Sequence, residues 1–157
     1  EYFTWNKVLV FNLGFNKKGT DTKSSWVYIP DKEVCFYRMG YYDNILGTSK
    51  MSLYIEMGFP NSFIIEDEQK YLHKVLKDLK KIGVVKDEEL IDYHSVVMDP
   101  AYVHINQKGI QSVGKYKKQL AQNNIYSIGR YGSWTYCSIE DNIIEAKDLA
   151  KNLLINQ

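Results

Sequence analysis

Residues 124–146, NIYSIGRYGSWTYCSIEDNIIEA, contain the clearest structural pattern in this chain. Ile125–Ile128 is a short β-rich run typical of a strand, and Gly129–Cys137 is a loop rich in glycine and aromatic residues. From Ser138 to Leu154, apolar residues recur along one side of a predicted helix. The pattern therefore predicts a final strand, loop and helix over residues 124–154.

The residues around the start of this helix have the chemistry of a ligand-binding surface. Ser138 stands three residues before Asp141, a spacing that predicts a variant of the capping box. A helix amino terminus offers unpaired N–H donors and partial positive charge, which suit a phosphate or an electron-rich ring edge. Gly129 allows close backbone approach, and Arg130 supplies a cation. Stacking surface would come from Tyr131, Trp134 and Tyr136. The alternative interpretation is a simple connection whose aromatic residues belong to the core.

Residues 124–146 resemble the closing flavin-binding motif of UDP-galactopyranose mutases and related flavin amine oxidase superfamily proteins. In that family the strand delivers a Gly-Arg pair, and the following helix points its amino end at the flavin. The resemblance implies that Gly129 and Arg130 lie against FAD. It also implies that the amides around Ile139 and Glu140 stabilise negative charge on the reduced flavin.

The same resemblance implies substrate contacts. Tyr136 matches a tyrosine that reaches the substrate diphosphate, so it is predicted to be catalytic and substrate-binding, with Trp134 beside it. Ser138, at the start of the predicted cofactor-binding helix, stands where the mutases usually have an aspartate. Tyr102 follows Ala101 as in an Ala-Tyr-Pro stretch of these proteins, although Val103 replaces the proline.

A second segment resembles the same family. Residues 35–44, CFYRMGYYDN, are similar to a mutase strand in which aromatic residues precede an arginine near flavin and substrate phosphate. The resemblance implies that Arg38 is a catalytic and substrate-binding cation. The alternative is an exposed arginine on a strand with two accessible faces.

The rest of the chain predicts an α+β fold with one domain over residues 1–157. We expect an antiparallel or mixed sheet of about six strands flanked by three helices, beginning with four strands and no helix between them. The predicted strands are 7–13, 26–29, 34–39, 51–57, 90–98, 102–105 and the short 125–128. The predicted helices are 71–82, 109–122 and 138–154.

Composition excludes several classes of function. Twenty Lys and Arg against nineteen Asp and Glu leave a net charge of +1, which does not favour nucleic-acid binding. No apolar run is close to the length of about 20 residues that a membrane-spanning helix needs. The scattered His73, His94 and His104 predict no metal site. Cys35 and Cys137 have no metal-like or redox-like spacing, which favours two free thiols in a reducing, cytoplasmic location, and a disulfide between them is the alternative.

The sequence lacks the GxGxxG loop with which this family holds the FAD pyrophosphate. We therefore expect a C-terminal fragment that does not retain FAD alone and whose partner is a missing N-terminal FAD-binding half. Separation from that half predicts an exposed apolar patch larger than about 400 Å², or a homodimer that covers it.

Three functions remain open. The first is a mutase-like flavoenzyme acting on a nucleotide sugar in polysaccharide or lipopolysaccharide assembly, in which the reduced flavin is the nucleophile and the protein supplies positioning and charge. The second is an amine oxidase-type oxidoreductase, separable from the first by amine turnover with oxygen consumption. The third is a non-enzymatic sugar- or protein-binding module, for which no dinucleotide-binding segment would precede the chain.

Overall fold

The computed structural model describes residues 2–155, and the chain forms two compact units. Unit 1 combines Glu1–Asn6 with Pro100–Gln157, and unit 2 is Lys7–Asp99. This division does not test the single domain predicted for residues 1–157, which stays a prediction.

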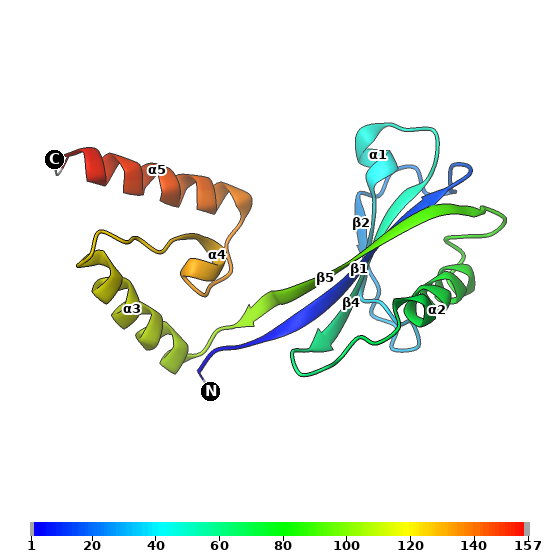
Figure 1. Ribbon diagram of the computed structural model, residues 1–157. Coiled ribbons are helices and arrows are strands. Elements are labelled where there is room, and N and C mark those ends of the chain that lie inside the picture. Colours follow the sequence, from blue (N-terminus) through cyan, green and yellow to red (C-terminus); the bar gives the residue numbers. More distant parts are fainter. Residues whose placement is uncertain (1, 156–157) are drawn as a thin grey trace. The chain divides into compact units, whose positions relative to one another are not determined.

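The elements in chain order are labelled in Figure 1. Those of unit 2, with the two strands that extend into unit 1, are β1 (Thr4–Phe15), β2 (Trp26–Tyr28), β3 (Arg38–Tyr41), α1 (Tyr42–Leu46), β4 (Ser52–Pro60), α2 (Glu68–Lys81) and β5 (Leu90–His104). The helices of unit 1 are α3 (Gln107–Ala121), α4 (Gly129–Gly132) and α5 (Ile139–Ile155). The α+β class is confirmed, with a five-stranded sheet in place of about six strands.

The strand order in the sheet is β2-β3-β4-β1-β5. β2 pairs antiparallel with β3, and β3 pairs antiparallel with β4. The register places Tyr28 opposite Arg38 and Arg38 opposite Glu56. In the next aligned row, Trp26 lies opposite Gly40, and Gly40 opposite Tyr54. Side chains in these two rows project to the same face of the sheet because strand residues two apart share a face.

Alternation along β1 determines which sheet face is buried. Leu9, Phe11, Leu13 and Phe15 are at most 2% exposed, whereas the residues between them are half-buried. The amphipathic helix α2 covers this face (Figure 1). Its buried contributions are Leu72, Val75 and Leu79. Unit 2 therefore has a closed hydrophobic core between one helix and one face of the sheet.

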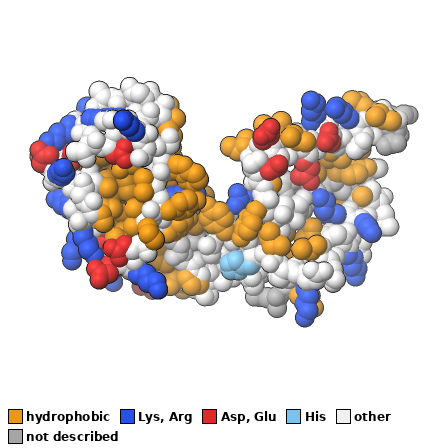
Figure 2. Space-filling view, turned by 180° about the vertical axis from the view of Figure 1, so that it is seen from behind, with side chains coloured by type: hydrophobic (Ala, Val, Ile, Leu, Met, Phe, Trp, Pro, Cys, Tyr) orange, Lys and Arg blue, Asp and Glu red, His pale blue; other side chains and the backbone are white. Residues whose placement is uncertain are grey.

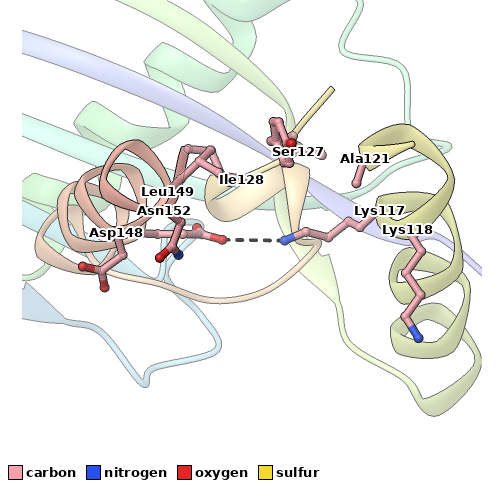
Figure 3. Close-up of a pocket in the computed structure, with 10 residues that line it drawn as sticks. Lys117, Lys118, Ala121, Ser127, Ile128, Asp148, Leu149 and Asn152 are labelled. Carbon is pink, nitrogen blue, oxygen red and sulfur yellow. Dashed lines mark ion pairs between the residues drawn. The ribbon is translucent and has the colours of Figure 1, made fainter. Parts of the chain in front are cut away.

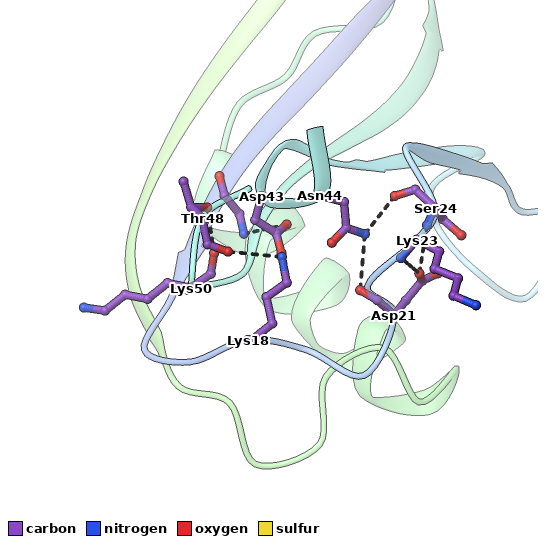
Figure 4. Close-up of polar contacts among 9 residues, drawn as sticks. Lys18, Asp21, Lys23, Ser24, Asp43, Asn44, Thr48 and Lys50 are labelled. Carbon is purple, nitrogen blue, oxygen red and sulfur yellow. Dashed lines mark hydrogen bonds and ion pairs between the residues drawn. The ribbon is translucent and has the colours of Figure 1, made fainter. Parts of the chain in front are cut away.

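A buried polar network ties the β1–β2 connection to α1 (Figure 4). Asp43 is 1% exposed and forms an ion pair with Lys18. The Asn44 side-chain amide donates to the carbonyls of Asp21 (3.2 Å) and Ser24 (2.9 Å). These contacts satisfy groups that would otherwise be costly to bury. The sequence predicts no helix between the first four strands, and α1 corrects that prediction.

Two strand predictions need correction. The strand predicted over residues 34–39 begins only at Arg38, because the preceding residues turn toward α2, where the Cys35 N–H donates to the Asp78 carboxylate (2.8 Å). The strands predicted on either side of Asp99-Pro100 are one continuous strand, β5. Pro100 lies in a strand at the end of the strand order, and edge strands are where sheets accommodate proline.

The strand predicted over Ile125–Ile128 is also wrong. The segment reaches an extended conformation at Ile128 (φ −134°, ψ 173°), but it belongs to no strand of the described residues. A strand requires a neighbour for its backbone hydrogen bonds, and residues 2–155 provide none here. The loop predicted from Gly129 starts instead with the short helix α4. The three predicted helices are confirmed as α2, α3 and α5 with slightly shifted ends.

The helices of unit 1 bury few side chains. Among the residues described for α5 none is buried, and Ile139, Ile143 and Leu154 are 82%, 62% and 73% exposed. Figure 2 shows hydrophobic side chains exposed among charged ones on one face of the molecule. The homodimer that would cover such surface stays a prediction. No helix within residues 2–155 is long and apolar enough to cross a membrane.

Truncating the core of unit 2 should destabilise it strongly. Leu79→Ala removes a side chain that is 0% exposed, and we expect a loss of about 3 kcal/mol in the free energy of unfolding. Leu46→Ala, at a position 72% exposed, is the matched control and should change stability by less than about 0.5 kcal/mol. Urea unfolding measures both, and equal effects would contradict the assigned core.

Cys35 should resist alkylation. Burial, followed by its hydrogen bond with Asp78, raises the pKa of the thiol from 9.0 to about 12. At pH 8 its thiolate fraction, and hence its rate with iodoacetamide, should be about a thousandfold below that of the unfolded chain. Because the folded pKa is raised, the linked stability is present below pH 9.0 and is lost as pH rises toward 12. Peptide mass spectrometry with and without urea tests this, and equal rates would contradict it.

Candidate functional site

The candidate site of unit 1 is built on the first turn of α5. The Ser138 hydroxyl accepts from the Asp141 N–H (3.1 Å), and the Asp141 carboxylate accepts from the Ser138 N–H (2.7 Å) and hydroxyl (2.8 Å). The backbone hydrogen bond, followed by the hydroxyl, lowers the pKa of Asp141. The predicted capping arrangement is confirmed. The predicted cofactor-binding residues Ile139 and Glu140 follow it directly, and both are exposed.

The next turn of α5 holds the Gly-Arg segment. The Gly129 N–H donates to the Glu145 carboxylate (2.7 Å), and the Arg130 N–H donates to Oδ1 of Asn142 (3.1 Å). Gly129 has φ +80°, and a Cβ there would lie 2.9 Å from that Asn142 oxygen. Glycine is therefore required both by its conformation and by the close approach of α5. The two backbone donors are already engaged within the protein.

Arg130 is held beside two tyrosine rings. Its guanidinium carbon lies 5.2 Å from the ring centroid of Tyr102 and 5.6 Å from that of Tyr136. The two rings meet edge to face at 6.4 Å. Nε of Arg130 is buried, and no described residue accepts a hydrogen bond from it. The structure thus brings together Arg130, Tyr102 and Tyr136, three of the residues predicted for the site.

Trp134 joins an aromatic cluster in the same unit. It has a left-handed backbone (φ +48°), and its ring meets Phe3 at 5.2 Å and Trp5 at 6.2 Å, both edge to face. A cavity of about 390 Å³ lies beside this cluster, with α3 residues forming its other wall. The substrate-binding role predicted for Trp134 stays a prediction.

A second cavity of unit 1 lies between α3 and α5 (Figure 3). Its volume is about 470 Å³, and Ser127 and Ile128 line it with residues of both helices. Lys117 reaches toward α5, forming an ion pair with Glu145 at 3.6 Å and donating to the Ser133 hydroxyl at 2.9 Å. The cavity therefore adjoins the two residues that directly precede the Gly-Arg pair.

Arg38 belongs to unit 2, where it is paired with Glu56. Its Nε and Nη2 donate to the same Glu56 oxygen at 3.0 and 2.5 Å, and the Tyr37 hydroxyl donates to the other oxygen at 2.5 Å. The guanidinium also lies within 6.0 Å of the ring centroids of Trp26 and Tyr28. Arg38 therefore contacts a carboxylate and aromatic rings, as an active-site cation or a structural pair would.

Sequence reasoning missed several of these residues. Glu56 could have been noticed because it is the one charged residue in the run 51–59. Asn142 and Glu145 gave no signal, because both read as ordinary polar positions on a helix. Within residues 2–155 no group of three or more His, Cys, Asp or Glu residues could hold a metal ion.

Comparisons with known proteins find a solved structure with a similar fold. No family model matches the chain, and no curated protein matches it. Among solved structures, the chain is similar to a reduced UDP-galactopyranose mutase, with a TM-score of 0.73 and 18% sequence identity. The chain has the fold of part of that enzyme. The match covers 85% of this chain and 30% of the mutase chain.

At this identity the similarity to UDP-galactopyranose mutase concerns the fold alone. It does not test the roles predicted for Gly129, Arg130, Tyr136 or the helix start, which remain predictions. The chain spans less than a third of the mutase structure it matches, so most of that protein has no counterpart here.

Removing the cap of α5 should loosen the site without unfolding unit 2. For Ser138→Ala we expect amide exchange in the first turn of α5 to accelerate about fivefold, because a side-chain cap is lost. Ser112→Ala, inside α3, is the control. Because the pKa of Asp141 is lowered, the cap's contribution is present above pH 3.8 and is lost as pH falls through the folded value. If the difference in amide exchange between wild type and Ser138→Ala were the same below pH 3.8 as above it, the role of Asp141 would be contradicted.

Proposed function

We propose that this chain is the substrate-domain and flavin-contacting portion of an FAD-dependent enzyme related to UDP-galactopyranose mutase. The proposed substrate is a nucleotide sugar of cell-surface polysaccharide biosynthesis, and the chain alone is inactive. The single observation that supports this most directly is the position of Arg130 between Tyr102 and Tyr136, in a chain that has the fold of part of the mutase.

The residues present fit an FAD edge. Arg130 has a buried Nε with no acceptor among the described residues, and such a donor is expected to meet a partner in the working protein. The exposed start of α5 adds the positive end of a helix dipole. When bound, FAD would supply the nucleophilic or electron-accepting chemistry that no side chain of this chain provides.

The side chains would position substrate and charge. Arg130 would present fixed positive charge against the ring edge of the cofactor, with the amides around Ile139 and Glu140 stabilising negative charge there. The Tyr136 hydroxyl would donate to the substrate diphosphate. Tyr102 and Trp134 would add ring surface. For Arg38, which belongs to unit 2, the proposed role is that of a substrate-binding cation.

The exposed apolar residues of α5 support the proposal that another segment of the intact protein covers this helix. A helix with an apolar side normally buries it, yet the described part of α5 buries no residue. Ile128 likewise has an extended backbone and lies in no strand of the described residues, as a residue that pairs with an adjacent strand would. A preceding dinucleotide-binding half would cover both, whereas a homodimer would have to cover them by symmetry.

An amine oxidase-type reaction is the second candidate. It is favoured by the Arg38–Glu56 ion pair, because a phosphate on Arg38 would have to share the guanidinium with a carboxylate at 2.5 Å or displace it. A substrate without phosphate would avoid that competition.

The complete gene product that contains this chain tests the proposal. We expect it to purify with FAD and, when reduced, to interconvert the pyranose and furanose forms of UDP-galactose. Arg130→Lys, which keeps the charge but removes Nε, should weaken FAD binding by about tenfold or more, since hydrogen bonds from charged groups contribute about 1.5–3 kcal/mol. Lys147→Met, at an exposed lysine of α5, should leave FAD affinity unchanged.

Three outcomes decide between the candidates. Absence of FAD from the complete protein would refute the flavin role. Oxygen consumption with an amine, and no change in UDP-galactose, would replace the mutase with the oxidase. Equal FAD affinity in wild type and Arg130→Lys would remove Arg130 from the cofactor site.

A further inference from the structure

The outer side of α2 carries a line of lysines. Lys70, Lys74, Lys77 and Lys81 are all exposed and follow one another at intervals of four, three and four residues. At about 3.6 residues per turn, this spacing places them on one side of the helix over a length of about 17 Å. These four residues are called the lysine stripe below.

The packing of α2 determines where the lysine stripe points. Leu72, Val75 and Leu79 are buried in the core of unit 2, on the side of the helix that covers the sheet (Figure 1). The helix cannot rotate without exposing these side chains to water, which would be costly. The lysine stripe is therefore held on the outer surface of unit 2.

Little negative charge neutralises the lysine stripe. Among the described residues, only Lys81 of the four forms an ion pair, with Glu33 at 2.7 Å. Asp78, the one acidic residue of α2 beyond its first turn, is buried and accepts from the Cys35 N–H. The whole chain has a net charge of only +1, so this helix side is a local concentration of positive charge.

Helix stability does not explain the lysine stripe. Neighbouring members are like charges three or four residues apart, and such pairs destabilise a helix slightly. Lys70 is the third residue of α2, near the amino end, where the helix dipole disfavours a cation. An anionic partner facing the stripe would relieve this repulsion.

An exposed apolar segment lies beside the amino end of the lysine stripe. Ile64 is 74% exposed, and Phe63 is 40% exposed. Phe63 stacks on Phe59 at 5.0 Å, and Phe59 meets Tyr71 of α2 edge to face at 5.4 Å. These contacts hold the segment next to the first turns of α2. Basic residues with exposed apolar side chains nearby are typical of proteins that lie on a membrane surface.

We propose that the lysine stripe, together with Ile64, docks this protein on a membrane surface rich in anionic phospholipid. The headgroup phosphates form an extended negative surface that can face the whole stripe at once. Ile64 can enter the boundary between headgroups and acyl chains, where an apolar side chain leaves water. A nucleic-acid duplex also offers phosphates, but its backbone gives Ile64 no apolar surroundings. The membrane is therefore the partner that the charges and the apolar segment together favour.

Cosedimentation with vesicles tests the proposal on the 157-residue chain. We expect binding to vesicles of phosphatidylglycerol and phosphatidylcholine in equal parts. Binding to pure phosphatidylcholine should be at least about tenfold weaker, since each lysine near an anionic surface strengthens binding about fivefold. Added salt should release the chain from the anionic vesicles, because exposed charges are screened.

Two double variants test the position of the charges. Lys74→Gln with Lys77→Gln removes two charges from the middle of the lysine stripe and should weaken binding to anionic vesicles about twentyfold. Lys23→Gln with Lys50→Gln is the matched control, because these exposed lysines lie near α1 in the same unit (Figure 4). The control lowers the net charge equally and should weaken binding less than about twofold.

Ile64→Ser tests the apolar contact. It removes an exposed apolar side chain and should weaken binding to anionic vesicles about fivefold, because less apolar surface leaves water on binding. Ile64 and the substituted lysines are exposed, and glutamine is nearly as good a helix former as lysine. Thermal unfolding should therefore show every variant folded as the wild type is.

Several results would overturn the proposal. Absence of binding to anionic vesicles, or equal binding to neutral ones, would refute an anionic docking surface. Equal losses in the two double variants would remove the lysine stripe from it, and unchanged binding of Ile64→Ser would remove the membrane contact. If a DNA duplex at equal phosphate concentration displaced the chain from vesicles, nucleic acid would be the favoured partner instead. These measurements involve neither flavin nor nucleotide sugar, so docking and the proposed function can fail independently.

Discussion

The candidate site depends on the hydrogen bonds that join α5 to the Gly-Arg segment. Asn142 and Glu145 accept the two backbone N–H groups of Gly129 and Arg130, and the glycine conformation at 129 lets the helix approach that closely. Arg130 can then lie beside the rings of Tyr136, six residues along the chain, and of the more distant Tyr102. Its guanidinium is oriented by these contacts before any ligand arrives, which lowers the entropic cost of using it.

The features predicted correctly from sequence were local ones. The cap at Ser138 and Asp141 depends only on two residues three positions apart. The helix α2 is predicted by the helical spacing of its apolar residues, which does not depend on the sheet that buries them. The Arg38–Glu56 pair depends on strand register, which sequence does not specify for two short strands separated by α1. The strand predicted over Ile125–Ile128 was wrong for a third reason: a strand-forming sequence becomes a strand only when another strand lies beside it.

The two units differ in how many hydrophobic residues they bury. Unit 2 closes its core between α2 and one sheet face, whereas Ala101 and Val103 are the only buried hydrophobic residues among those described for unit 1. Hydrophobic burial is the main favourable term in folding, so unit 1 gains less of it from its own residues. The residues that resemble a flavin-binding motif thus occur in the unit that buries fewer hydrophobic residues.

The two arginines carry the same charge but meet opposite surroundings. Arg38 has a carboxylate in direct contact and rings around it, so its row on the sheet is electrically neutral. Arg130 is held by ring faces, and its Nε has no acceptor among residues 2–155. A ring face attracts a cation but does not take the place of a hydrogen-bond acceptor for its Nε–H. The two arginines therefore differ in what neutralises them: a carboxylate in unit 2, and only aromatic rings among the described residues of unit 1.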